Sequence, residues 1–65
     1  MSILKVINMV IMECEENNKQ VNDIDIVDGL LLVNLENGVN FSLPYRFMTT
    51  EEIRYKVIAV CKWSE

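Results

Sequence analysis

The sequence contains no histidine, and its 65 residues include only two cysteines, two glycines and one proline. Without histidine the chain lacks the commonest metal ligand and the usual general base, and two isolated cysteines cannot form a structural zinc site. It also has no glycine-rich phosphate-binding loop and no serine in a recognisable nucleophile motif. We therefore expect a protein that is not an enzyme and uses no cofactor or metal.

Long apolar runs are missing as well. Residues 2–12, SILKVINMVIM, are too short and too interrupted by Lys5 and Asn8 to cross a bilayer, and they lack the basic start and cleavage site of a signal peptide. Cys14 and Cys61 could form one bridge, but the lack of a multi-cysteine framework favours reduced thiols. These features predict a cytoplasmic protein that does not bind membranes.

Basic residues are few: six lysines and arginines stand against ten acidic residues, which gives a formal net charge of −4. The acidic residues are concentrated between positions 13 and 36, where seven of them accompany a single lysine. Phosphate repulsion opposes direct nucleic-acid binding by such a chain. A basic protein partner, for instance one that handles nucleic acids, is compatible with this charge.

The alternation of apolar and polar residues in residues 30–43, LLLVNLENGVNFSL, predicts one β-hairpin register. A two-residue turn at Asn37 and Gly38 would mix polar and apolar side chains on both faces. A three-residue loop at 36–38, with Gly38 in the left-handed conformation of a bulge, instead places six apolar side chains on one face. The predicted pairs are Leu35 with Val39, Val33 with Phe41, and Leu31 with Leu43.

A second turn at Asp28 and Gly29 extends the same pattern upstream, because both residues tolerate positive φ. It pairs Ile26 with Leu31 and Ile24 with Val33, and it turns Asp23 and Asp25 to the solvated face. Residues 23–27, 30–35 and 39–43 therefore form a predicted three-stranded antiparallel meander. Its apolar wall consists of Ile24, Ile26, Leu31, Val33, Leu35, Val39, Phe41 and Leu43.

The two ends of the chain are less clearly patterned. The many β-branched side chains of residues 3–12 favour a strand, although Leu4, Ile7 and Ile11 also recur at helical spacing. Residues 15–20, EENNKQ, are predicted to form a polar loop.

A helix is predicted to begin at Thr50. Thr49 and Glu52 have the spacing of a capping box, and Met48 can pack on Ile53 as a hydrophobic staple. Residues 57–63 fit either a continuation of this helix or a returning strand. The expected fold is a single α+β domain, residues 1–65, with an antiparallel β-meander of three to five strands and one short capped helix starting near Thr50.

The segment DGLLLVNLENGVNFSLP, followed by TTEEIRYK and a final KWSE, resembles the small bacterial domain-of-unknown-function family numbered 2442. Members of that family carry a strand, a DG hairpin, a vPl strand exit, an ATPEER helix start and a strand that ends in tryptophan. The resemblance covers about residues 24–65. The resemblance implies that residues 57–63 return as a strand. The family has no established enzyme activity, and the resemblance implies that the protein binds a partner in the manner of an antitoxin.

Three groups of residues are candidates for partner binding. An acidic group could imitate phosphates and occupy a basic surface, or it could simply be a solvated strand and loop. Leu30 and Leu32 could form a partner or dimer contact, unless the N-terminal segment covers them. Trp63 could contact a partner or belong to the core. The acidic group consists of Glu13, Glu15, Glu16, Asp23, Asp25 and Asp28.

The function expected from these residues is that of a small inhibitor or antitoxin-like protein that covers a basic surface of its target. A bacterial or a phage origin is expected. Seven isoleucines and seven asparagines are compatible with an AT-rich genome, which keeps a phage-encoded inhibitor in view. The competing hypothesis is a homo-oligomerising accessory domain, such as a homodimer, whose acidity only keeps it in solution.

Overall fold

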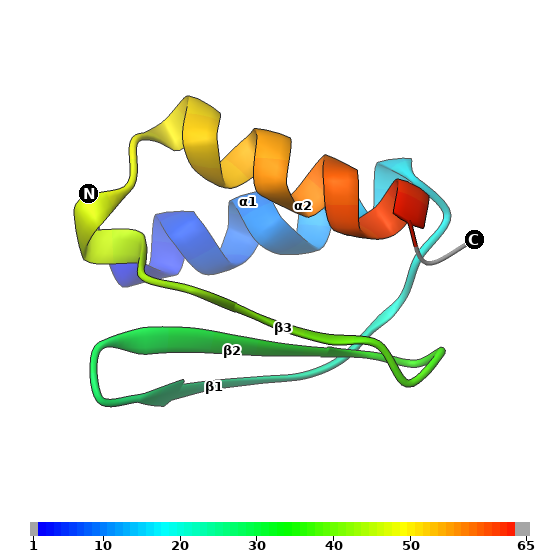
Figure 1. Cartoon of the computed structure of the whole chain (residues 1–65), viewed down its shortest axis with the longest axis horizontal. Coiled ribbons are helices and arrows are strands. Elements are labelled where there is room, and N and C mark those ends of the chain that lie inside the picture. Colours follow the sequence, from blue (N-terminus) through cyan, green and yellow to red (C-terminus); the bar gives the residue numbers. More distant parts are fainter. Residues whose placement is uncertain (1, 64–65) are drawn as a thin grey trace.

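The chain folds into two helices and a three-stranded sheet in a computed structural model that describes residues 2–63. Helix α1 covers Ile3–Glu16 and helix α2 covers Thr50–Trp63. Strands β1 (Val21–Val27), β2 (Leu30–Leu35) and β3 (Asn40–Leu43) form an antiparallel sheet in the order β1-β2-β3, and the short 3-10 helix η1 (Tyr45–Phe47) leads into α2. Both helices lie on one face of the sheet and run in the same direction (Figure 1). The α+β class and the antiparallel meander are confirmed.

The register of the β2–β3 hairpin is the predicted one. Leu31 lies opposite Leu43 and Val33 opposite Phe41. The amide of Leu35 donates to the carbonyl of Val39 at 2.9 Å, and Gly38 has φ +91° at the end of the three-residue loop. Alternation with a period of two therefore fixed which side chains face the core, because a slip of one residue would exchange the faces.

The turn between β1 and β2 is also confirmed. Asp28 has φ +51° and Gly29 has φ +78°, the pair of positive values that a type I′ turn requires. Ile26 lies opposite Leu31 and Ile24 opposite Val33. Ile26 keeps 47% of its surface exposed, however, because β1 is an edge strand, so it contributes little to the predicted apolar wall.

The N-terminal segment forms helix α1, so the strand predicted for residues 3–12 is wrong. Val6, Val10 and Cys14 are fully buried at helical spacing, whereas Leu4 remains 70% exposed. Burial of this stripe against the sheet outweighs the modest preference of β-branched residues for strands. The hydroxyl of Ser2 accepts a hydrogen bond from the amide of Lys5 at 3.3 Å and caps the first turn.

Helix α1 ends within the segment that was predicted to be a polar loop. Asn18 takes a left-handed conformation with φ +60°, the amide of Lys19 donates to the carbonyl of Cys14 at 2.9 Å, and the amide of Asn18 donates to that of Glu15 at 3.0 Å. This is a Schellman motif with asparagine in the place that glycine usually takes. Residues 17–20 are therefore loop, and residues 15 and 16 belong to α1.

Helix α2 starts at Thr50 as predicted and continues to Trp63. The amide of Glu52 donates to the Thr49 hydroxyl at 3.1 Å, and the Glu52 carboxylate accepts from the Thr49 amide at 2.9 Å. Residues 57–63 are helical, which decides between the two alternatives and contradicts the strand that the family resemblance implied. Ile53, Val57 and Cys61 form its fully buried stripe.

The core lies between the sheet and the two helices. Its members come from α1, β2, the end of β3 and α2, and the partly buried Met48 packs against it. The buried side chains are Val6, Val10, Cys14, Leu31, Val33, Leu35, Leu43, Ile53, Val57 and Cys61.

Candidate functional site

The sheet surface opposite the helices, which we call the outer face, carries four of the predicted site residues. Side chains directly opposite each other in an antiparallel pair share a face. Asp25 lies opposite Leu32 and Val27 opposite Leu30, and these four residues point away from the buried side chains of β2. The full outer face consists of Asp23, Asp25, Val27, Leu30, Leu32, Asn34, Asn40 and Ser42.

Leu30, Leu32 and Val27 form an apolar patch on this face. Val27 is 44% exposed and the two leucines are half-buried. Helix α1 packs on the other side of the sheet, so the N-terminal segment does not cover Leu30 and Leu32, and that alternative is wrong. The patch therefore lies open between the carboxylates of β1 and the polar side chains of β3.

The charge of the outer face is of one sign. Asp23 and Asp25 are exposed, and no lysine or arginine occurs in the three strands. Within residues 2–63 the ion pair is that of Arg54 with Glu13, so neither aspartate has a cationic partner. Asp28, in the turn after β1, adds a third carboxylate at the Val27 end of the face. Oδ1 of Asp25 accepts a hydrogen bond from the Ile26 amide at 2.9 Å. Two carboxylates without a cationic partner beside an apolar patch can receive the lysine or arginine side chains of another protein.

Glu13 does not belong to this surface. It is buried to 9% residual exposure, and its Oε1 accepts a hydrogen bond from Nε of Arg54 at 3.0 Å. The carboxylate thus joins α1 to α2, and it is not available to a partner. Predicting it as a surface acid was wrong, because the sequence did not show that α1 would turn this side chain toward α2.

Glu15 and Glu16 lie near the end of α1, in the helical layer. Glu15 lines a shallow groove between α1 and β1 together with Asp23 and Ile24, so it approaches the edge of the outer face. Glu16 lines a separate hollow on α1 with Met9 and Met12. The predicted acidic group is therefore divided among several places and does not form one patch.

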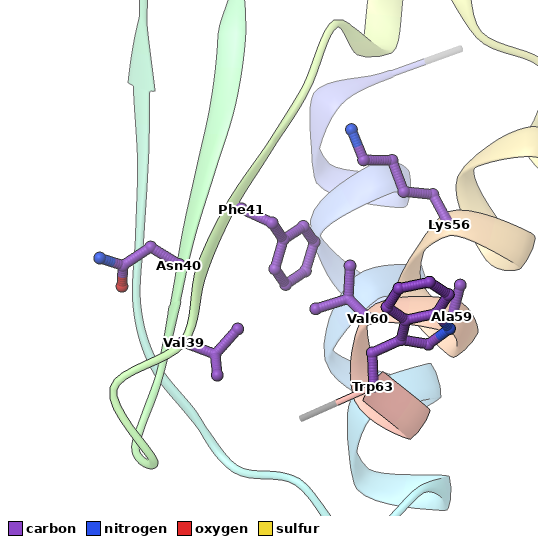
Figure 2. A pocket seen from close by; sticks show the side chains of 7 residues that line it. All are labelled: Val39, Asn40, Phe41, Lys56, Ala59, Val60 and Trp63. Atoms are coloured by element: carbon purple, nitrogen blue, oxygen red, sulfur yellow. The ribbon is translucent and has the colours of Figure 1, made fainter. Parts of the chain in front are cut away.

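Trp63 is not a core residue: it is 89% exposed at the end of α2. It borders an apolar groove of about 420 Å³ between β3 and α2, which we call the β3–α2 groove. Figure 2 shows Phe41 of β3, and Val39 just before this strand, extending toward Val60, while Asn40 points away from the helix. The lining residues are Val39, Asn40, Phe41, Lys56, Ala59, Val60 and Trp63.

Lys56 is the charged member of this groove, and its Nζ donates to the carbonyl oxygen of Ser42 at 2.9 Å. The β3–α2 groove was not predicted from the sequence. Its walls come from residues 39–41 and 56–63, and they form only if the second segment is helical. The one sequence signal was the surplus of apolar residues in residues 57–63, a segment that fitted both a helical and a strand periodicity.

Residues 2–63 contain no group of three or more histidine, cysteine, aspartate or glutamate side chains that could hold a metal ion. Neither cysteine belongs to a disulfide, both are buried, and burial together with the neighbouring Cys61 thiol raises the pKa of the Cys14 thiol to about 12. Such a thiol is almost fully protonated near neutral pH and is a poor nucleophile. Over the same residues, no helix is long and apolar enough to cross a membrane.

Comparisons of the chain with protein-family models, with curated proteins and with solved structures found no match. The resemblance to the family numbered 2442 therefore stays a prediction. The molecule has two open surfaces that could bind a partner, the outer face and the β3–α2 groove.

Proposed function

We propose that this protein is a non-catalytic binding protein, an inhibitor or antitoxin-like partner of bacterial or phage origin, and that its outer face covers a basic surface of its target. The observation that carries the proposal is the uncovered patch of Val27, Leu30 and Leu32 beside the carboxylates of Asp23 and Asp25, which have no cationic partner among residues 2–63. Apolar contact supplies affinity in such an interface, whereas the carboxylates select a basic partner and accelerate its approach.

The shape and the charge of the outer face both suit a flat protein surface as the target. The outer face is a sheet surface without a deep cavity, which suits another protein better than a small molecule. Its acidic charge opposes nucleic acid, and the target's basic surface could itself be one that binds nucleic acid. The protein would then inhibit by occupying that surface.

The competing proposal is a homodimer formed through the same apolar patch. Its supporting observation is again the exposure of Val27, Leu30 and Leu32. Against it, the chain exposes 4374 Å², close to the roughly 4300 Å² that a folded monomer of 7.6 kDa is expected to expose. In addition, a two-fold contact would bring the aspartates of the two copies together in a face that has no basic residue in its strands.

Charge reversal on the outer face tests the first proposal. The double variant Asp23→Lys/Asp25→Lys is compared with Glu16→Lys/Glu51→Lys, which changes the net charge equally but leaves the outer face intact. Each protein is immobilised and exposed to host lysate at low and at high salt. We expect a lysate protein to bind the immobilised wild type and the control variant at low salt and to dissociate from both at high salt. The same lysate protein should not bind the outer-face variant.

The activity of the retained protein is then measured with and without the purified chain. Loss of that activity with the wild type and its persistence with the outer-face variant would support inhibition. Retention that is equal for both variants would contradict the role of the outer face. Sedimentation at micromolar concentrations tests the competing homodimer proposal. A wild-type dimer that Leu32→Ser disrupts would favour homodimerisation.

A further inference from the structure

The edge of strand β3 has backbone groups that point out of the sheet. The Leu35 amide donates to the Val39 carbonyl, which therefore faces β2, whereas the Val39 amide donates to Oδ1 of Asn37 in the loop. By alternation along the strand, the backbone groups of Phe41 and Leu43 also face β2. The backbone groups of Asn40 and Ser42 therefore face away from β2. Since β3 is the last strand of the sheet, these groups lie at an open edge.

One of these groups has a partner, the Ser42 carbonyl that accepts from Nζ of Lys56. Lysine at a strand edge discourages indiscriminate pairing with other strands, because the ammonium must first be displaced. A carboxylate can displace it at little cost, since the ammonium then exchanges a carbonyl for an anion. Lys56 thus makes the edge selective for an acidic strand.

The β3–α2 groove lies beside this edge on the side of the helices. A strand added to β3 would alternate its side chains, and those facing inward would lie against Phe41 and Val39 and under Val60 and Trp63. The lining there is apolar, so the inward side chains opposite these residues should be apolar. The inward position near Lys56 should carry the carboxylate.

We propose that the β3–α2 groove binds an extended acidic peptide segment of a partner protein, which adds to the sheet as a strand beside β3. The segment has two apolar residues and one glutamate or aspartate at alternating positions, all facing the groove. Strand addition provides main-chain hydrogen bonds for affinity and side-chain pockets for specificity. The charge of Lys56 selects an acidic segment, in contrast to the basic surface proposed for the outer face, so the two surfaces would bind different partners or different parts of one partner.

A second copy of the chain fits this place less well. Its β3 would bring its own α2 to the same side of the sheet, where the groove has room beside Val60 and Trp63 for the side chains of one strand. An isolated extended segment brings no helix. The groove is also short, because β3 has four residues, which matches a peptide of about that length.

The test uses the blocked peptide acetyl-Thr-Glu-Thr-Val-Thr-Val-Thr-amide and the isotope-labelled full chain. Paired antiparallel to β3, it places the glutamate near Lys56 and the two valines opposite Phe41 and Val39. We expect saturable shifts of the Asn40 and Ser42 amide resonances. Replacing the glutamate by glutamine should weaken binding about threefold to fivefold, the effect of one exposed ion pair.

N-methylation tests strand pairing directly. The amides of the two threonines opposite Asn40 and Ser42 face the edge of β3, whereas the valine amides face solvent. Methylating those two threonine amides should abolish binding, and methylating the two valine amides should preserve it. Equal loss with both peptides, or no saturable shift of Asn40 and Ser42 up to millimolar peptide, would overturn the proposal.

Protein variants complete the design. Lys56→Gln should remove the preference for glutamate over glutamine, and Lys62→Gln, an equal loss of charge on the same helix, should keep it. Trp63→Ala should weaken binding of the glutamate peptide and of the glutamine peptide. Asp23→Lys/Asp25→Lys should bind the peptide as the wild type does, so the result is independent of the outer face. If the Asn40 and Ser42 amides instead shift with protein concentration alone, a second copy occupies the edge and the proposal is wrong.

Discussion

The thiol of Cys14 shares a hydrogen bond with the thiol of Cys61, and both side chains are fully buried between α1 and α2. The two helices run in the same direction, so residues near their C-terminal ends lie side by side (Figure 1). The sequence left open whether these cysteines approach each other, because their 47-residue separation says nothing about distance. Neither belongs to a disulfide, as the scarcity of cysteines predicted.

Stability at alkaline pH should depend on Cys14. Its pKa is raised from 9.0 to about 12, chiefly by burial, so the folded state keeps a proton that the unfolded state loses above pH 9. The contribution is complete below pH 9 and is lost as the pH rises toward 12, at up to about 1.4 kcal/mol per pH unit. Denaturant unfolding at several pH values should show a shallower decline for Cys14→Ala than for the wild type. Identical slopes would contradict the raised pKa.

The ion pair between Arg54 and Glu13 should stabilise the contact of the two helices. Arg54→Met leaves the carboxylate of Glu13, whose side chain is 12% exposed, without its cation, and we expect a loss of about 1 kcal/mol in the free energy of unfolding. The value is modest because the Arg54 side chain is 53% exposed. Urea unfolding measures the effect, and Lys62→Gln serves as a matched loss of charge on α2. In the Glu13→Gln background the same Arg54 substitution should cost less.

The two hydrogen bonds of the capping box at the start of α2 should each contribute to stability. Thr49→Ala removes the hydroxyl that accepts from the Glu52 amide and should cost about 1 kcal/mol of stability. Glu52→Ala should be destabilising as well, whereas Glu52→Gln keeps an acceptor for the Thr49 amide and should cost less. Thermal unfolding of the three variants checks this order. A glutamine variant as unstable as the alanine variant would show that the charge, and not the hydrogen bond, matters.

The turn between β1 and β2 is expected to accept few residues. Asp28 has φ +51°, so Asp28→Gly should be tolerated, whereas Asp28→Val should cost about 1–2 kcal/mol because a β-branched side chain is strained there. Gly29→Ala should destabilise through backbone strain alone, since no atom lies within 4 Å of the position of the added Cβ. Chemical denaturation gives the values. An unaffected Gly29→Ala would contradict the assigned turn geometry.

The sheet could be predicted from the sequence because its determinants are local. Alternation in residues 30–43 and the turn residues at 28–29 and 36–38 specify faces and register together. The same reasoning failed for residues 3–12, where β-branched side chains favoured a strand and only packing against a sheet selects the helix. The end of α1 was missed because Asn18, and not glycine, takes the left-handed position.

The candidate surfaces were predictable only in part. Strand alternation correctly placed Asp23, Asp25, Leu30 and Leu32 on one uncovered face. Charge alone grouped Glu13 with them, although its burial depends on Arg54, which is 41 residues away in the sequence. The β3–α2 groove depends on how two distant segments pack, and neither segment shows by itself that Lys56 would reach the edge of β3.

Because helices cover one side of the sheet only, strand β2 is subject to two different evolutionary constraints. Leu31, Val33 and Leu35 are buried in the core, and selection would remove almost any replacement there because it would impair folding. Leu30, Leu32 and Asn34 alternate with them and can drift at small cost to the fold. A lineage could therefore change the chemistry of one sheet surface by substituting every second residue of one strand while the scaffold stays the same.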